Sequence, residues 1–169
     1  IFAQHAGRFE QARAHLERAR EMAVRAELAR LEGIVRANAG VLAFEQGRLE
    51  ACRRQLDLAL GIAREQDDRR TEAALLGNVA YLARQQGRLE DAERGMRRAL
   101  ELAGQMGDRR TLGIVSGNLA GLYAEQGRLG EAIEGVERAR HIARELGESR
   151  WEGYWLIELG ELCARDGQT

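Results

Sequence analysis

Three asparagines recur at intervals of 40 residues, at Asn38, Asn78 and Asn118. Asparagine is a mediocre residue for the middle of a helix because its side chain competes for backbone hydrogen bonds, so three equivalent placements call for a reason. Each amide offers both a donor and an acceptor, which fits the backbone of an extended peptide. The row therefore indicates peptide recognition. Two alternative explanations of the row stay open. The amides could bond to the neighbouring 40-residue segment and so have a structural role, or the segments could have inherited the asparagine from a common ancestor.

A row of arginines follows the same interval and offers a second kind of recognition. Guanidinium forks hold carboxylates bidentately, so the row could bind an acidic ligand. The alternative, which we favour, is that the forks pair with acidic residues in the turns that precede them. The arginines are Arg30, Arg70, Arg110 and Arg150, and the acidic residues are Asp67, Asp68, Asp108 and Glu148.

Side chains suited to catalysis or metal binding are few. Of the histidines, His5, His15 and His141, the last two are expected on the polar faces of helices without a cysteine or carboxylate partner at ligand spacing. Cys52 and Cys163 replace small core residues in separate repeats, so we expect both to be buried and distant from each other. A chain without lysine cannot form a Gly-x-x-x-x-Gly-Lys phosphate loop. The sequence therefore predicts no enzyme activity, no catalytic or metal-binding residue and no cofactor.

Composition narrows the class of protein. The 169 residues include no proline, all 26 basic residues are arginine, and the net charge is −1. The lack of the commonest helix breaker favours helix throughout. Evenly spread charge and the lack of an apolar run of ~20 residues predict no nucleic-acid partner and no membrane contact. Reduced cysteines predict a cytoplasmic location, and because the sequence opens on Ile1 without methionine we expect a piece of a longer protein.

The elements that must position these residues repeat with a period of 40. Apolar residues on either side of a recurring glycine follow helical spacing, and the glycine supplies the left-handed residue that a helix end favours. We expect a helix over about 8–25, hairpins over 28–65, 69–106 and 109–146, and a final helix over 149–166. The repeats begin with "GRFEQA" at Gly7, "GRLEAC" at Gly47, "GRLEDA" at Gly87 and "GRLGEA" at Gly127, and Gly167 falls on the next step.

The pattern resembles the tetratricopeptide repeat (TPR) over essentially the whole chain. The period exceeds the family's usual value of about 34 and the closing proline is missing, as in the longer-period repeats similar to those of kinesin light chains and bacterial signalling proteins. The resemblance implies an all-α, TPR-like α-solenoid of about eight stacked helices, forming a single domain over 1–169. The small residues that carry it are Gly40, Ala80, Ala120 and Gly160 in the first helices and Ala12, Cys52, Ala92 and Ala132 in the second.

The segment "GIVSGNLAG" places a glycine at every fourth position of an expected helix, at Gly113, Gly117 and Gly121. Each glycine costs a helix interior about 1 kcal/mol relative to alanine. A bare edge would let a ligand chain approach the backbone closely, or it would let neighbouring helices pack closely. Both explanations stay open.

In the TPR family the first helices line a concave groove, and the resemblance places the candidate residues there. The leading hypothesis is a scaffold that binds a protein or peptide as an extended or helical segment, with an acidic segment as one option. Trp155 is expected in the core, whereas Trp151 is expected to contact a partner. The alternative is an assembly or regulatory arm of a larger bacterial signalling protein, an ATPase regulator or kinase, that makes contacts or self-associates through its uncapped ends. The candidate peptide-binding residues are Asn38, Asn78, Asn118, Tyr81, Gly117, Gly121, Arg70, Arg110, Arg150 and Trp151.

Overall fold

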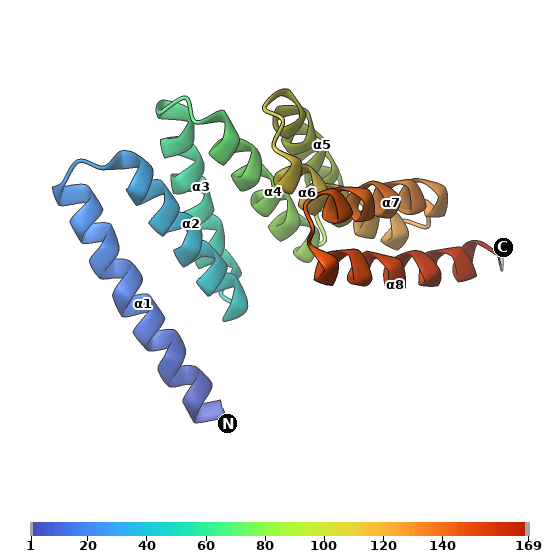
Figure 1. Cartoon of the computed structure of the whole chain (residues 1–169). Coiled ribbons are helices and arrows are strands. Elements are labelled where there is room, and N and C mark those ends of the chain that lie inside the picture. Colours follow the sequence, from blue (N-terminus) through green and yellow to red (C-terminus); the bar gives the residue numbers. More distant parts are fainter. Residues whose placement is uncertain (1, 168–169) are drawn as a thin grey trace. The chain divides into compact units, whose positions relative to one another are not determined.

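The computed structural model describes the backbone of residues 2–167 and the side chains of residues 8–167. Over these residues the chain forms eight α-helices and no strand, which confirms the all-α fold class (Figure 1). Across the same described part, no helix combines the length and the apolar character that crossing a bilayer requires. The helices are α1 (Phe2–Arg25), α2 (Ala29–Glu45), α3 (Leu49–Glu65), α4 (Arg69–Gln85), α5 (Leu89–Gln105), α6 (Arg109–Glu125), α7 (Leu129–Glu145) and α8 (Ser149–Asp166).

Left-handed glycines separate the two helices of each hairpin. Gly47, Gly87 and Gly127 have φ angles of 70°, 73° and 75°, a region that L side chains rarely adopt, which confirms the expected role of these three glycines. The same expectation is wrong for Gly7 and Gly167. Gly7 lies inside α1, and Gly167 ends α8 with a φ of −71°. An isolated glycine costs a helix only about 1 kcal/mol, so α1 continues through it.

Aspartates cap the N-termini of α4 and α6, which are the first helices of their hairpins. Asp108 Oδ1 accepts a hydrogen bond from the backbone N–H of Thr111 at 3.2 Å, and the Thr111 hydroxyl donates to Oδ2 at 2.8 Å. Asp68 accepts the backbone N–H of Thr71 at 3.1 Å in the same way. Such caps satisfy backbone donors that the first turn leaves unpaired. At the start of α8 the residue in this place is Glu148, which forms no side-chain cap.

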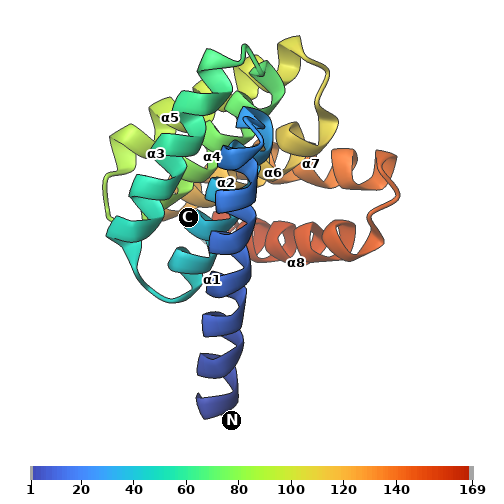
Figure 2. The same ribbon diagram turned by 90° about the vertical axis from the view of Figure 1, so that its left-hand side faces the viewer.

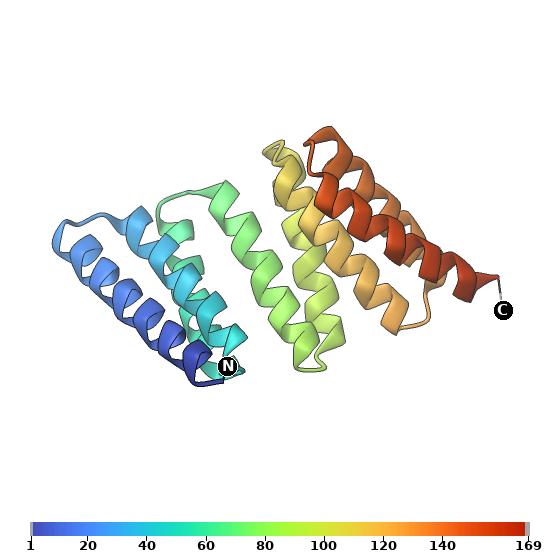
Figure 3. The ribbon, with the colours of Figure 1, turned by 60° about the horizontal axis from the view of Figure 1, so that its bottom comes forward.

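The chain divides into two compact units, Ile1–Leu75 and Leu76–Thr169, with the boundary inside α4. In the first unit α2 packs against both α1 and α3, and Figure 3 shows α1 and α2 side by side. In the second unit α6 packs against α5 and α7, and α7 packs against α8, to which a short turn joins it (Figure 2). The core of the second unit is built around Met96, Leu122 and Val136, each at most 2% exposed. That residues 1–169 form one domain stays a prediction.

Small residues let the two helices of a hairpin approach closely. A Cβ added to Gly40 of α2 would lie 3.1 Å from the Leu56 side chain of α3. A Cβ added to Gly113 of α6 would lie 2.9 Å from the Ile142 side chain of α7. In both hairpins the second helix therefore rests a branched side chain directly on the backbone of the first.

Candidate functional site

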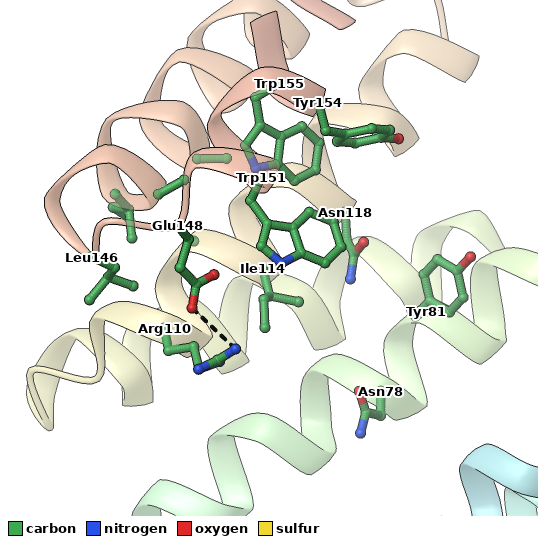
Figure 4. A pocket seen from close by; sticks show the side chains of 14 residues that line it. Asn78, Tyr81, Arg110, Ile114, Asn118, Leu146, Glu148, Trp151, Tyr154 and Trp155 are labelled. Atoms are coloured by element: carbon green, nitrogen blue, oxygen red, sulfur yellow. Dashed lines mark ion pairs between the residues drawn. The ribbon is translucent and has the colours of Figure 1, made fainter. Parts of the chain in front are cut away.

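The second unit contains a cleft of about 310 Å³ between α4, α6, α7 and α8 (Figure 4). Its floor is made by Gly113 of α6 and by α7 side chains such as Ile142, and its walls carry both amide and aromatic groups. The remaining lining residues are Asn78, Tyr81, Arg110, Ile114, Asn118, Ala139, Ala143, Leu146, Glu148, Trp151, Tyr154 and Trp155.

One wall of the cleft is aromatic and comes from the first turns of α8. Trp151, Tyr154 and Trp155 are spaced by three and four residues, which places them on one helix face. The two indoles stack with their ring centroids 6.2 Å apart, and Tyr154 meets the Trp155 ring edge-on at 4.7 Å. Trp151 is 47% exposed and Tyr154 is 46% exposed, so large apolar area faces the cleft without a covering element. Burial raises the pKa of the Tyr154 phenol, and a hydrogen bond with Glu158 adds to this effect.

The opposite wall carries two of the three recurring asparagines. Asn78 is exposed on α4 and Asn118 is half-buried on α6. Figure 4 shows the Asn118 amide beside the Trp151 indole, with Asn78 and Tyr81 on α4. The face of α4 and α6 that the sequence marked as the groove therefore lines a real hollow, together with the exposed side chain of Ile114.

Two arginines of the row, Arg30 and Arg110, pair with carboxylates, but not with those of the turns that precede them. Arg110 Nη2 lies 3.1 Å from Glu148 Oε1, across the mouth of the cleft (Figure 4). Arg30 Nε lies 3.9 Å from Asp68 Oδ2 in the first unit. Each partner lies in the turn that follows the arginine's own hairpin. Arg30 at the start of α2 thus meets the turn before α4, and Arg110 at the start of α6 meets the turn before α8. The expected pairing with the preceding turn is wrong for these two arginines.

Two of the three glycines of α6 carry side chains of neighbouring helices on their backbone. A Cβ on Gly117 would collide with the indole ring of Trp155, and Gly117 itself is buried. Gly113 lies in the same way beneath Ile142 of α7. The smooth edge of α6 accommodates the protein's own side chains, which favours the close-packing explanation.

The third glycine, Gly121, lies beneath the guanidinium group of Arg84. A Cβ on Gly121 would lie 2.8 Å from Arg84 Nη1. The Arg84 fork binds Glu125 at 3.1 and 2.7 Å, and its Nη1 donates to the backbone carbonyl of Asn118 at 3.3 Å. The hydrogen bond from Arg84 lowers the pKa of Glu125. Because Arg84 covers it, Gly121 offers no bare backbone to a ligand in this arrangement.

Comparison with known proteins finds a family model that matches part of the chain. A family model described as "Tetratricopeptide repeat" matches residues 1–18 and 34–57. The helical hairpins of the structure, their period of 40 and this match agree with the resemblance drawn from the sequence. The two matched segments are similar to tetratricopeptide repeats. A search of curated protein sequences found no match.

Solved TPR-like structures share the fold at low sequence identity. BtubC (BKLC) from P. vanneervenii is 19% identical with a TM-score of 0.70, over 98% of this chain and 77% of that one. A Podosopora anserina protein named for kinesin light chain, with nearly identical TPR-like repeats, is 12% identical with a TM-score of 0.63, over 98% and 92% of the two chains. A Rap protein complexed with Competence and Sporulation Factor is 15% identical with a TM-score of 0.62, over 95% of this chain but only 49% of that one. At these identities the likeness shows the fold alone.

Five of the ten candidate residues line the cleft, and five do not. Asn38 is exposed on α2, in the other compact unit, and Gly117 and Gly121 lie beneath side chains. Arg70 and Arg150 are exposed and lie outside the cleft lining. The candidates that do line it are Asn78, Tyr81, Arg110, Asn118 and Trp151.

Part of the aromatic wall was not predicted from the sequence. Trp155 packs against the core, as expected, but it also lines the cleft and stacks on Trp151. Leu146, in the turn before α8, was given no role and lines the cleft as well. The spacing of the two tryptophans was the available signal, because residues four apart share a helix face.

The histidines lie at the surface or outside the described side chains. His15 and His141 are exposed, as expected, and the side chain of His5 lies outside the described residues. The expectation that His141 lacks a carboxylate partner is wrong, since its Nε2 lies 3.1 Å from Glu145 Oε1 one helical turn away. Among the described residues, no three His, Cys, Asp or Glu side chains gather closely enough to hold a metal ion.

The two cysteines of the chain differ in exposure. Cys52 is buried, as expected, and burial raises the pKa of its thiol. Cys163 is exposed, so the expectation of a second buried cysteine is wrong. The equivalent position in α6 is Tyr123, which is 6% exposed. A second helix of the hairpin covers that side of α6, whereas no described helix covers it on α8.

Proposed function

We propose that the chain is a protein-interaction scaffold that binds a peptide segment in the cleft of its second unit. One observation carries the proposal: exposed apolar side chains converge on two amide groups in a hollow of about 310 Å³. Ile114, Trp151 and Tyr154 are each about half exposed, at 50%, 47% and 46%. Exposed large apolar groups gathered in a concave site are the usual mark of a binding surface.

The chemistry of the cleft favours an uncharged anchor on the partner. An aliphatic or aromatic side chain would fill the hollow between the Trp151 indole and Ile114 and would bury their exposed area. Asn78 and Asn118 would each donate and accept hydrogen bonds with the partner's main chain. Arg110 is already paired with Glu148, so an acidic anchor would have to compete with that carboxylate. We therefore propose recognition of shape and main chain before charge, without a catalytic step or a cofactor.

The comparisons support a binding role without naming a partner. The Rap protein of the same fold was crystallised with Competence and Sporulation Factor, so this architecture holds a partner in at least that case. For the present chain, a peptide or protein partner and a cytoplasmic setting are proposals, as is the lack of nucleic-acid or membrane contact.

The chain carries its own reporter for this test. Trp151 and Trp155 are its only two tryptophans, and both line the cleft. Peptides that bind the immobilised chain are first selected from a random displayed library. Each selected peptide is then titrated into the chain in solution while the tryptophan fluorescence emission is recorded. We expect the selected peptides to share an aliphatic or aromatic residue and to change the emission on binding.

Variants then locate the contact. Asn118→Ala should weaken a selected peptide about fivefold to tenfold, because a net hydrogen bond contributes about 1 kcal/mol. Met106→Ala is the matched control, since Met106 is exposed in the turn before α6 and lies outside the cleft lining. Peptides that leave the emission unchanged, or that bind Asn78→Ala and Asn118→Ala as tightly as the original chain, would contradict the proposal.

A second candidate function is favoured by the outer surface of α8. Leu156 is 50% exposed and Ile157 is 65% exposed on this helix. Contacts through such an end face would suit an assembly or regulatory arm of a larger signalling protein.

A further inference from the structure

A pocket of about 270 Å³ lies between α1, α2 and α3 in the first unit. Part of its lining is apolar and comes from side chains such as Val35 and Leu42. Of its thirteen lining residues, five are arginines and one, Glu17, is acidic, so positive charge dominates it. We call it the arginine pocket, and its arginines are Arg13, Arg20, Arg36, Arg48 and Arg54.

The second unit contains an equivalent pocket in which the charges balance. It has a volume of about 330 Å³ and lies between α5, α6 and α7. Eight of the thirteen residues that line the arginine pocket have a counterpart 80 positions later that lines this one, so the two pockets share one origin in the repeat. Its charged lining residues are two arginines and two glutamates, namely Arg97, Arg138, Glu131 and Glu134.

The equivalent pocket also shows that the arginine pocket does not depend on where the sequence begins. The helix before α5 is α4, and it contributes no residue to the lining of the pocket between α5, α6 and α7. A helix at the same place before α1 would likewise leave the arginine pocket open.

Arg48 lacks the groups that neutralise its counterpart in the second unit, Arg128. Arg128 Nη1 lies 2.9 Å from Glu93 Oε2, and its Nε lies 2.6 Å from Glu131 Oε1. The guanidinium carbon of Arg128 also lies 4.0 Å from the centre of the Tyr123 ring. Two alanines and a further arginine replace both carboxylates and the ring in the first unit. In the order Glu93, Glu131, Tyr123, the residues 80 positions earlier are Arg13, Ala51 and Ala43.

Two other arginines of the pocket stand where the second unit has uncharged side chains. Arg20 and Arg36 occupy the positions of Leu100 and Ser116. The Arg36 side chain is only 16% exposed, and its Nη2 lies 2.6 Å from a carboxylate oxygen of Glu32. Withdrawing a guanidinium group from water costs free energy, so arginine in place of an uncharged residue in such a pocket calls for a compensating interaction.

Carboxylates of the first unit neutralise only part of the charge. Within the described part of the chain, Arg48 and Arg54 form no ion pair. The other three arginines pair with glutamates of their own helices at 2.6–2.7 Å, namely Arg13 with Glu10, Arg20 with Glu17 and Arg36 with Glu32. Five arginines against three paired glutamates leave the pocket an excess charge of +2.

We propose that the arginine pocket binds a small anion that carries two or more phosphate groups. Guanidinium forks bind phosphate oxygens bidentately, and Arg48 and Arg54 can do so without giving up an ion pair. Two unpaired forks and the excess charge of +2 match two phosphate groups better than one. The described lining residues include no aromatic ring on which a base could stack, so the phosphate groups are the part of the ligand that is recognised. This inference does not depend on peptide binding in the cleft.

Calorimetric titration of the 169-residue chain with inorganic diphosphate tests the proposal. The titration is done at about 0.15 M salt, because at this ionic strength separate surface charges are largely screened. We expect one diphosphate to bind per chain with a submillimolar Kd. Inorganic monophosphate and sulfate should bind at least about tenfold more weakly, since each offers only one group to the two unpaired forks.

Variants then locate the bound anion. Arg48→Ala and Arg54→Ala should each weaken diphosphate binding at least about tenfold, because hydrogen bonds between charged groups are the stronger ones. Ala51→Glu gives Arg48 the carboxylate that Arg128 has in Glu131 and should weaken binding similarly. Both replaced arginines are exposed and unpaired among the described residues, so thermal unfolding without ligand should be unchanged by their removal.

Arg18→Ala is the matched control, because Arg18 is an exposed arginine of α1 that lies outside the pocket lining. It removes the same charge and should bind diphosphate like the original chain. A chain that binds no diphosphate, or that binds monophosphate as tightly, overturns the proposal. So does an affinity that Arg48→Ala and Arg54→Ala leave unchanged, or that Arg18→Ala lowers as much as they do.

Discussion

Two clefts occupy equivalent places in the two compact units, and they differ in the side chains at one end. The cleft of the first unit has a volume of about 260 Å³, compared with about 310 Å³ in the second. Each of its nine lining residues has a counterpart 80 positions later, and all nine counterparts line the second cleft. At the varying end, Thr71 and Gln66 of the first unit correspond to Trp151 and Leu146 of the second.

The comparison separates what the repeat provides from what single residues add. The hollow itself comes from the packing of a hairpin, with Gly33 under Ile62 in one unit and Gly113 under Ile142 in the other. The aromatic wall, in contrast, comes from substitutions in one repeat. Thr71 also donates its backbone N–H to Asp68 and so belongs to a helix cap. The scaffold therefore makes similar hollows, and a few side chains decide which of them presents apolar surface to a partner.

Exchanging the residue that differs most should have the largest effect. Trp151→Thr gives the second cleft the residue of the first, and we expect it to weaken a library-selected peptide by at least ~2 kcal/mol, or about 30-fold, as is usual for a central aromatic anchor. Thr71→Ala in the first unit should leave the affinity unchanged. Titration by calorimetry measures both, and equal effects of the two substitutions would remove the distinction between the clefts.

Gly117 tests whether the aromatic wall requires a bare backbone beneath it. The first unit has Ala37 in place of Gly117 and Leu75 in place of Trp155. Gly117→Ala should lower the free energy of unfolding by about 1–2 kcal/mol, because the added methyl group collides with the indole. Urea unfolding followed by circular dichroism measures this change.

Matched variants identify the cause of that loss. Gly130→Ala, where an added Cβ meets nothing within 4 Å, should instead stabilise α7 by up to about 1 kcal/mol. In a Trp155→Leu background, which copies the smaller residue of the first unit, the penalty of Gly117→Ala should largely disappear. A penalty that persists there would show that Trp155 is not its source.

The helix starts that border the two clefts should differ in strength. Asp68 caps α4, whereas Glu148 forms no cap and pairs with Arg110 at the surface. Asp68→Ala should therefore cost about 1 kcal/mol of unfolding free energy, and Glu148→Ala about 0.5 kcal/mol or less. Thermal unfolding of the two variants gives the comparison, and an equal loss would contradict the assignment of the caps.

The smallest effect on the free energy of unfolding is expected from substitutions in the turns before α4 and α8. Asp67 has a φ of 49° and its counterpart Gly147 has a φ of 71°, both in the left-handed region. Asp67→Gly should raise the free energy of unfolding by a few tenths of a kcal/mol, because glycine adopts this region without a steric cost, and Gly147→Asp should lower it by a similar amount. Chemical unfolding measures both, and changes of the same sign would contradict the explanation from backbone strain.

The sequence predicted the helices and the turns well because both depend on local chemistry that recurs. The spacing of apolar residues and the glycines at Gly47, Gly87 and Gly127 placed the hairpins. The same period placed Asn78, Asn118 and Tyr81 on one side of their helices, and the structure shows them on one cleft. Local periodicity fixes which way a side chain faces, and this much is available from the sequence.

What the sequence left open depends on contacts between distant residues. The partner of Arg110 is 38 positions away in the following turn, and spacing within one repeat could not identify it. The role of Gly117 depends on where the Trp155 ring lies. Cys163 was expected to be buried from its repeat position, but its exposure depends on whether a further helix covers α8. These features belong to the packing of helices and not to their pattern.

The contact made by Arg84 has a consequence for the cleft. Its guanidinium group ties α4 to Glu125 and to the backbone of Asn118 on α6, and its side chain is only 16% exposed. The two helices that present Asn78 and Asn118 are thereby held at a fixed spacing before any ligand arrives. A preorganised pair of amides loses little conformational entropy on binding, so more of each hydrogen bond is retained as affinity.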